Sequence, residues 1–205
     1  MTESLRERQR AQIRADIRRA AFRLFIDRGY DAVTTEEIAA AAGVSPRTFF
    51  RHVPAKEELL LAPVRYGGAA IVSLLEERPA AESPDLALIN AIITRTRSFG
   101  VADTEEWREA MLVAPDLLGK LTMHLPADKE RATKLVAERM GANPDTDIRP
   151  GLLVQLAFAA ADFAFQQWVR QSTKKPRALD RYVTEALEAV KSPLWRRRQR
   201  EWRRS

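Results

Sequence analysis

The chain lacks cysteine and has only two histidines, His52 and His124, among its 205 residues. Without cysteine there can be no disulfide, thiolate metal site or cysteine nucleophile. The sequence also has no Gly-rich phosphate loop and no cluster with metal-ligand spacing, so candidates for catalysis are scarce. We therefore expect no enzyme activity, no cofactor and no metal. The cysteine usage suits a reducing cytoplasm.

Long apolar segments are scarce too. The one long stretch runs from Leu152 to Val169 and contains Asp162, whose charge would be costly in lipid. We interpret the stretch as a buried helix and expect no membrane partner. The N-terminus is charged from Glu3 onward and has no apolar signal-peptide core. A cytoplasmic protein is therefore expected.

Basic residues give the chain a formal net charge of +6. The excess lies almost wholly in residues 191–205, which hold seven basic residues and one acidic residue. This Arg-rich and Trp-rich tail has two interpretations. It is either a disordered or partner-facing segment, or a nonspecific contact to nucleic acid.

No segment shows convincing β alternation, and apolar residues recur at helical spacing. Ile13, Ile17, Ala21, Leu24 and Phe25 lie on one helical stripe, which Gly29 ends as a left-handed C-cap. The pattern predicts an all-α fold of about nine helices, separated by prolines. The further expected helices span residues 34–42, 46–52, 55–77, 85–99, 104–124, 127–140, 149–171 and 177–198.

In the segment 33–56 (VTTEEIAAAAGVSPRTFFRHVPAK), nearly every residue is typical of a helix start, a turn or a buried helix face. Thr34 and Glu37 form a capping box, and Val33 with Ile38 forms a hydrophobic staple across it. Gly43 supplies a sharp turn. Ser45 is a good N-cap for the second helix, and Pro46 sits at its first position.

Two capped helices joined by a glycine turn predict a helix-turn-helix, whose second helix enters the DNA major groove. In the second helix, Val44, Phe49 and Val53 are spaced to face inward, which leaves donor-rich side chains outside. The same corner also occurs as a plain packing unit, so this pattern alone leaves both interpretations open.

The stretch 25–60 resembles the DNA-binding signature of the tetracycline-repressor (TetR) family. The matching elements are Gly29-Tyr30, Thr34-Thr35, Ile38-Ala39, Ala42-Gly43-Val44-Ser45, Thr48-Phe49-Phe50, His52, Lys56 and Leu59-Leu60. The resemblance implies a bacterial transcriptional regulator with a DNA-binding domain in residues 1–60. It implies an effector-binding and dimerisation domain in residues 61–205.

The resemblance also implies which residues meet DNA. Thr35 would contact a phosphate, and Arg47 would either read a guanine or contact a phosphate. Arg51, His52 and Lys56 look like phosphate contacts, with Lys56 in the first turn of the next helix. The full set of DNA-contact candidates is Thr35, Ser45, Pro46, Arg47, Thr48, Phe50, Arg51, His52 and Lys56.

Two features near the DNA end are open. Phe50 replaces the family's usual tyrosine, so it has no hydroxyl for a phosphate; it is expected either on the DNA side, partly exposed, or packed inward. Arg6, Arg8 and Arg10 are expected in a polar arm before the first helix. This arm either follows phosphates or a minor groove, or is an ordinary solvated terminus.

The resemblance implies a homodimer formed by the last two long helices, about 149–171 and 177–198, which suits a pseudo-palindromic operator. Gln155, Asp162, Gln166 and Arg170 form a polar stripe on the first of them. This stripe is either a water-facing edge or a lining of a ligand cavity. Candidate ligand contacts, each of which is also a plausible core residue, are Trp107, Met111, Leu118, Met123, Phe158, Asp162, Phe165 and Trp168.

The expected function is a repressor of transcription that a small, largely apolar ligand releases from operator DNA. The alternative is a constitutive DNA-binding dimer, or an activator, without a ligand pocket. Paired acids such as Glu36-Glu37 and Glu105-Glu106 lie at helix starts, where the helix dipole accounts for them without any catalytic role.

Overall fold

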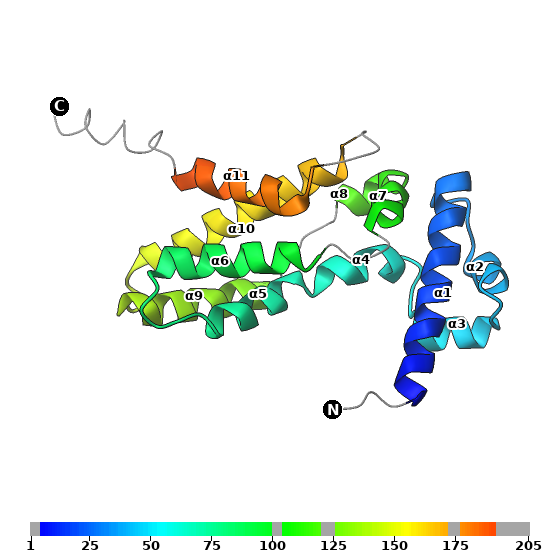
Figure 1. Cartoon of the computed structure of the whole chain (residues 1–205), viewed down its shortest axis with the longest axis horizontal. Coiled ribbons are helices and arrows are strands. Elements are labelled where there is room, and N and C mark those ends of the chain that lie inside the picture. Colours follow the sequence, from blue (N-terminus) through cyan, green and yellow to red (C-terminus); the bar gives the residue numbers. More distant parts are fainter. Residues whose placement is uncertain (1–4, 100–103, 120–125, 172–176, 192–205) are drawn as a thin grey trace. The chain divides into compact units, whose positions relative to one another are not determined.

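The computed structural model describes residues 5–99, 104–119, 126–171 and 177–191, and every regular element in these ranges is a helix (Figure 1). The all-α prediction is confirmed. The chain divides into two compact units. Unit 1 comprises Met1–Arg65 and Val101–Leu121, and unit 2 comprises Tyr66–Gly100 and Thr122–Ser205.

Unit 1 is built around the first helix. Ile17, Ala21 and Phe25 of the predicted stripe are fully buried, and Phe22 is buried beside them. Gly29 has a φ of +85° at the end of this helix, as the C-cap prediction requires. The helices of unit 1 are α1 (Leu5–Arg28), α2 (Thr35–Ala41), α3 (Pro46–His52), α4 (Glu58–Arg65), α7 (Thr104–Leu112) and α8 (Pro115–Gly119).

The first helix begins earlier than the sequence pattern suggested. Arg6, Arg8 and Arg10 lie within α1 and not in an arm that precedes it. The segment before Ile13 is rich in Arg, Glu, Gln and Ala, which are good helix formers, and it contains no Gly or Pro. Local propensity therefore extends the helix beyond its apolar stripe.

Residues 101–121, from the middle of the chain, belong to unit 1. Helix α7 packs against α1 and α4, and it buries Trp107, Ala110 and Met111. The Trp107 indole Nε1 donates a hydrogen bond to the carbonyl of Leu60 at 2.9 Å. The division predicted at residue 60 thus differs from the compact units, because this contact joins residues 47 positions apart in the sequence.

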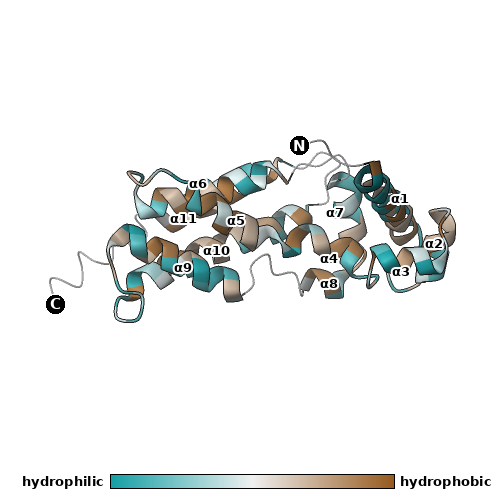
Figure 2. Ribbon diagram, turned by 90° about the horizontal axis from the view of Figure 1, so that it is seen from below, coloured by the Kyte–Doolittle hydropathy of each residue, from teal (hydrophilic) through white to brown (hydrophobic). Residues whose placement is uncertain are grey.

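Unit 2 is arranged around α10, which packs against α6, α9 and α11. Its helices carry hydrophobic and hydrophilic residues side by side, as amphipathic helices do (Figure 2). Val154, Phe158, Phe165 and Val169 of α10 are fully buried. The helices of unit 2 are α5 (Gly67–Glu76), α6 (Pro84–Arg97), α9 (Pro126–Met140), α10 (Ile148–Val169) and α11 (Leu179–Lys191).

Two expected helices are each divided. The segment 55–77 is interrupted at Tyr66, between α4 and α5, and α7 ends before Pro115 begins α8. A Cβ at Gly68 would lie 2.3 Å from Oδ2 of Asp128 in α9, so a glycine is needed at this close approach. The apolar periodicity of the sequence does not reveal such a contact.

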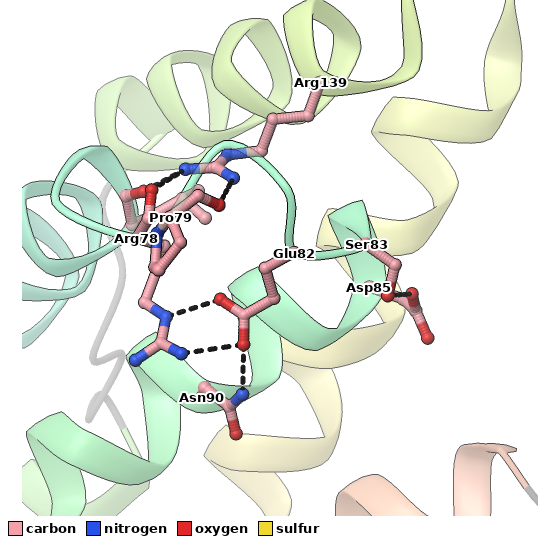
Figure 3. Close-up of polar contacts among 8 residues, drawn as sticks. Arg78, Pro79, Glu82, Ser83, Asp85, Asn90 and Arg139 are labelled. Carbon is pink, nitrogen blue, oxygen red and sulfur yellow. Dashed lines mark hydrogen bonds and ion pairs between the residues drawn. The ribbon is translucent and has the colours of Figure 1, made fainter.

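The loop between α5 and α6 is held by two arginines (Figure 3). Arg139 of α9 donates to the carbonyls of Leu75, Arg78 and Pro79 at 3.1, 2.7 and 2.9 Å. Arg78 forms a two-pronged ion pair with Glu82 at 2.6 and 2.7 Å. The three bonds from Arg139 tie the end of α5 and the loop to α9.

Two segments, Glu58–Glu76 and Ile148–Val169, are long and apolar enough to cross a membrane by length and composition alone. A core helix of a soluble protein passes the same test. Helix α10 packs against α6, α9 and α11 and carries Asp162, so its apolar character is accounted for by packing within unit 2.

Candidate nucleic-acid interface

The start of α2 is held by the predicted capping box. The backbone N–H of Glu37 donates to Oγ1 of Thr34 at 3.2 Å, and the N–H of Thr34 donates to Oε2 of Glu37 at 2.9 Å. Arg28, in the last turn of α1, donates to Oε1 of Glu37 at 2.8 Å. The backbone bond from Thr34, and then the bond from Arg28, lower the pKa of Glu37 to about 2. The predicted staple residues Val33 and Ile38 are both buried.

The turn between α2 and α3 has the expected geometry. Gly43 has a φ of +67°, a left-handed conformation that favours glycine. Ser45 is the N-cap of α3: its Oγ accepts from the N–H of Thr48 at 3.1 Å and lies 3.0 Å from Oγ1 of Thr48. Pro46 occupies the first turn of α3, where its missing N–H costs nothing.

Helix α3 buries one face and exposes the other. Phe49 is fully buried and Val53 nearly so, whereas Arg47 and Arg51 are exposed. Phe50 is 48% exposed, and its ring packs edge-to-face on Phe49 at a centroid distance of 5.3 Å. The face that carries Arg47, Phe50 and Arg51 is therefore available to a ligand.

Most of the other predicted DNA contacts are also at least partly accessible. Ser45 and Pro46 are exposed, and Thr35, Thr48 and His52 are half-buried. The hydroxyl of Thr35 donates to Oε2 of Glu36 at 3.0 Å. The hydroxyls of Ser45 and Thr48 are engaged with each other, so their first role is to cap α3.

Lys56 does not lie in the first turn of the next helix, where the sequence analysis placed it. It precedes α4, which begins at Glu58, and its Nζ donates to the carbonyls of Tyr30 and Val33, each at 2.9 Å. The same Nζ lies 4.1 Å from the centroid of the Tyr30 ring. The ammonium group therefore connects the segment before α4 to the segment between α1 and α2, a role that the sequence pattern did not reveal.

Comparison with known proteins assigns both parts of the chain. Residues 17–62 match the family described as bacterial regulatory proteins of the tetR family, and residues 82–194, more than half of the chain, match the MftR C-terminal domain. The regulator TcmR of Streptomyces glaucescens is 32% identical over 98% of this chain and 90% of its own. The chain belongs to the TetR family.

One further relative agrees with this TetR assignment, and one solved structure shares the fold. The mycofactocin biosynthesis transcriptional regulator MftR of Mycobacterium tuberculosis is 27% identical, with 92% of each chain covered. The crystal structure of NalD, the secondary repressor of a multidrug efflux pump in Pseudomonas aeruginosa, has the same fold. Its TM-score is 0.52 at 20% identity, over 87% of this chain and 94% of that one. This TetR-family chain is thus a DNA-binding transcriptional regulator and not an enzyme.

The ligand candidates of this TetR-family chain fall into separate groups. Trp107, Met111 and Leu118 are buried in unit 1, and Met123 lies outside the described residues. Phe158, Phe165 and Trp168 are buried in α10 of unit 2, and Asp162 is half-buried there. In the polar stripe, Nη1 of Arg170 donates to the Gln166 side chain at 3.4 Å, as expected of a ladder within one helix.

An aromatic cluster in unit 2 includes a residue that the sequence analysis missed. The Phe99 ring lies 5.5 Å from that of Phe165 and 6.2 Å from that of Trp168, both edge-to-face. Arg95 lies over Phe99 at 5.4 Å, and burial lowers the pKa of Arg95. The spacing of Arg95 and Phe99 by four residues on one helical face was the available signal.

Proposed function

We propose that this TetR-family regulator is a cytoplasmic repressor that binds a pseudo-palindromic operator as a homodimer and is released by a small, largely apolar ligand. Residues 1–60 would carry the DNA contacts. Residues 61–205 would carry the effector site and the dimer interface, apart from α7 and α8, which belong to unit 1.

The exposed face of α3 is the observation that carries the proposal. Arg47 projects one turn before Arg51 from a short helix whose opposite face is anchored by buried Phe49. A guanidinium with two parallel donors can read O6 and N7 of guanine, which contributes about 1–3 kcal/mol of discrimination. Phe50, half exposed beside it, offers an apolar contact to a thymine methyl group or a sugar.

Three exposed apolar side chains of α10, which we call its apolar stripe although Gln155 and Gln166 share that face, support dimerisation. Ile148, Leu152 and Phe163 are 79%, 52% and 61% exposed, although the opposite face of the same helix forms the core of unit 2. Large apolar side chains in a row are unfavourable in water, and burial against a second copy would remove them from it. A two-fold dimer would present two copies of α3 about 34–36 Å apart, the repeat of successive major grooves.

The aromatic cluster of Phe99, Phe165 and Trp168 supports a largely apolar effector. Such rings offer flat, polarisable surfaces, and half-buried Asp162 on the same helix could orient a polar group. The effector would lower operator affinity only to the extent that it prefers the DNA-free state of the dimer over the bound state.

The test is binding of the purified protein to the DNA upstream of its own gene, at two salt concentrations, against a shuffled duplex of the same composition. We expect specific, salt-sensitive binding that Arg47→Ala weakens by about 1–3 kcal/mol. Arg131→Ala, which removes an exposed arginine from α9, is the matched control and should bind as the wild type does. Equal affinity for the shuffled duplex and every segment of the upstream DNA would contradict operator recognition.

The same assay tests the effector. Titration of apolar small molecules into the operator complex should identify one that releases the DNA. That release should weaken when Phe165 is replaced by alanine in a variant that still binds the operator. Complete insensitivity to a broad ligand panel would favour a constitutive regulator.

A further inference from the structure

A cleft of about 600 Å³ lies in unit 1 between the N-terminal half of α1 and the C-terminal end of α3. Arg6, Arg10 and Arg14 recur every fourth residue and therefore lie on one face of α1. We call this space the arginine cleft. Its lining residues are Arg6, Gln9, Arg10, Ile13, Arg14, Arg51 and His52.

The arginine cleft is positively charged without compensation from within the described part of the chain. No acidic side chain lines it, and none of its four arginines forms an ion pair with a described residue. Arg19, farther along α1, does pair with Asp16. Four guanidinium groups around one cleft repel one another, so an anion that enters it relieves this repulsion.

His52 also lines the cleft, and one of its ring nitrogens is unsatisfied. Its Nε2 is buried and has no hydrogen-bond partner among the described residues. Burial first, and then the charges of Arg51, Arg14 and Arg10, lower the pKa of His52 below its ordinary 6.5. The groups that face His52 are therefore cationic or neutral, from α1 as well as from α3.

We propose that the arginine cleft binds phosphodiester groups of duplex DNA beside the bases that α3 reads, and that His52 takes up a proton when a phosphate fills it. The inference rests on the proposed operator binding. It adds a face of α1 to the surface that contacts DNA. It also couples DNA binding to the uptake of one proton by His52.

Continuity with α3 favours DNA as the source of the phosphate. Arg51 follows Arg47 by one helical turn, a rise of about 6 Å. A duplex whose bases meet Arg47 therefore brings its backbone within reach of Arg51 and the cleft behind it. Duplex DNA carries one negative charge per about 1.7 Å of its axis, so several phosphates are available to the row on α1.

Proton uptake follows from the change in charge around His52. In the free protein the surrounding arginines and burial disfavour the imidazolium form. A phosphate in the cleft brings a negative charge close to His52 and offsets the charges of the arginines, so the pKa of His52 rises in the complex. Affinity should therefore increase as pH falls between the raised pKa in the complex and the lowered pKa in the free protein, by at most tenfold per pH unit for one proton.

The first experiment measures the salt dependence of binding to a duplex of unrelated sequence. Compared with the wild type, the double variant Arg10→Gln/Arg14→Gln should bind more weakly and lose about one unit of log–log salt slope for each phosphate contact removed. Arg19→Gln/Arg23→Gln is the matched control, because it also removes two exposed arginines of α1 and neither of them lines the cleft. Thermal unfolding of each variant confirms that it is folded.

The second experiment measures proton uptake by calorimetry of wild-type protein with the same duplex, in two buffers of different ionisation enthalpy. Uptake that is present in the wild type, retained in His124→Gln and lost in His52→Gln supports the proposal. No uptake by the wild type between pH 5.5 and 7.5 overturns the role of His52, whatever the variants do.

The outcomes separate this inference from the proposed function. If the wild type binds its operator but Arg10→Gln/Arg14→Gln matches Arg19→Gln/Arg23→Gln in affinity and slope, the inference fails and operator binding stands. If no duplex is bound, the proposed function itself fails. If inorganic phosphate displaces the duplex much more effectively than chloride at equal ionic strength, and Arg10→Gln/Arg14→Gln abolishes this difference, the cleft prefers free phosphate and the DNA assignment is overturned.

Discussion

At the scale of single residues, Glu37 connects three parts of unit 1. Its carboxylate accepts from the Thr34 backbone at the cap of α2 and from Arg28 at the end of α1. Its own backbone N–H is bound by the Thr34 hydroxyl. One ionised side chain therefore joins the end of α1 to the start of α2. Helix α3 packs against both of these helices.

This role predicts a specific pH dependence. The pKa of Glu37 is about 2 in the folded protein against an ordinary 4.5, so its contribution to stability is complete above pH 4.5 and is lost as pH falls toward 2. Denaturant unfolding of wild type and Glu37→Gln should show a stability difference at pH 6 that shrinks as pH falls below 4.5. A difference that stays constant from pH 6 to 3 would mean that the carboxylate does not act through its charge.

Lys56 leads to a prediction that distinguishes an internal contact from a DNA contact. Because Nζ donates to the carbonyls of Tyr30 and Val33, Lys56→Met should destabilise the free protein by about 1–3 kcal/mol. The measurement is chemical denaturation in the absence of DNA. A lysine used only to contact phosphate would leave that stability unchanged, and only the affinity for DNA would fall.

At the scale of elements, the α5–α6 loop depends on a side chain from α9. Arg139 donates to the carbonyl of Leu75 at the end of α5 and to the loop carbonyls of Arg78 and Pro79; Figure 3 shows it beside Arg78 and Pro79. Arg139→Ala should lower the free energy of unfolding by about 1–3 kcal/mol, because three hydrogen bonds from a charged donor to this part of the chain are lost. Arg131→Ala, which breaks an exposed pair with Glu76, should cost less than about 1 kcal/mol. Equal losses in the two variants would show that the loop does not need its donor.

The elements also show where sequence analysis succeeds. Residues 46–52 were predicted as a helix and form one, because Ser45, Pro46 and Pro54 mark its ends locally. The interruption at Tyr66 was missed, since it accompanies a close approach of Gly68 to Asp128, 60 positions away. Helix ends that are marked by capping residues and prolines are predictable from the sequence, whereas breaks that accompany distant contacts are not.

At the scale of the whole molecule, the exposed stripe on α10 predicts how the chain associates. Phe163→Glu would place a charge in the proposed interface and should weaken dimerisation by about 2 kcal/mol or more. Sedimentation velocity over a concentration series measures the shift toward monomer, and affinity for a two-half-site operator should fall with it.

Leu86→Glu is the matched control for that experiment. Leu86 is a 44% exposed leucine of α6 that is not part of the stripe. This variant should sediment as the wild type does. A dimer that resists Phe163→Glu but dissociates with Leu86→Glu would place the interface elsewhere.

The candidate site was predictable only in part, and the reason differs between residues. The outward orientation of Arg47 and Arg51 was predicted from helical spacing and is confirmed, whereas Phe50 was left open; that these residues contact DNA stays a prediction. The internal contact of Lys56 was missed because its carbonyl acceptors lie 23 and 26 positions earlier in the chain. Arg14 was not among the predicted DNA contacts, because only the packing of α1 against α3 brings it next to His52.

The membership of α7 in unit 1 bears on how parts of such regulators can be exchanged. The chain passes between its two units three times, after residues 65, 100 and 121. A chimera joined at residue 60 would leave the Leu60 carbonyl without its Trp107 donor and would uncover the α1 surface that α7 buries. A graft that carries residues 101–121 along with the first 65 keeps that surface covered, so the transferable cassette is discontinuous in the gene although it is continuous in space.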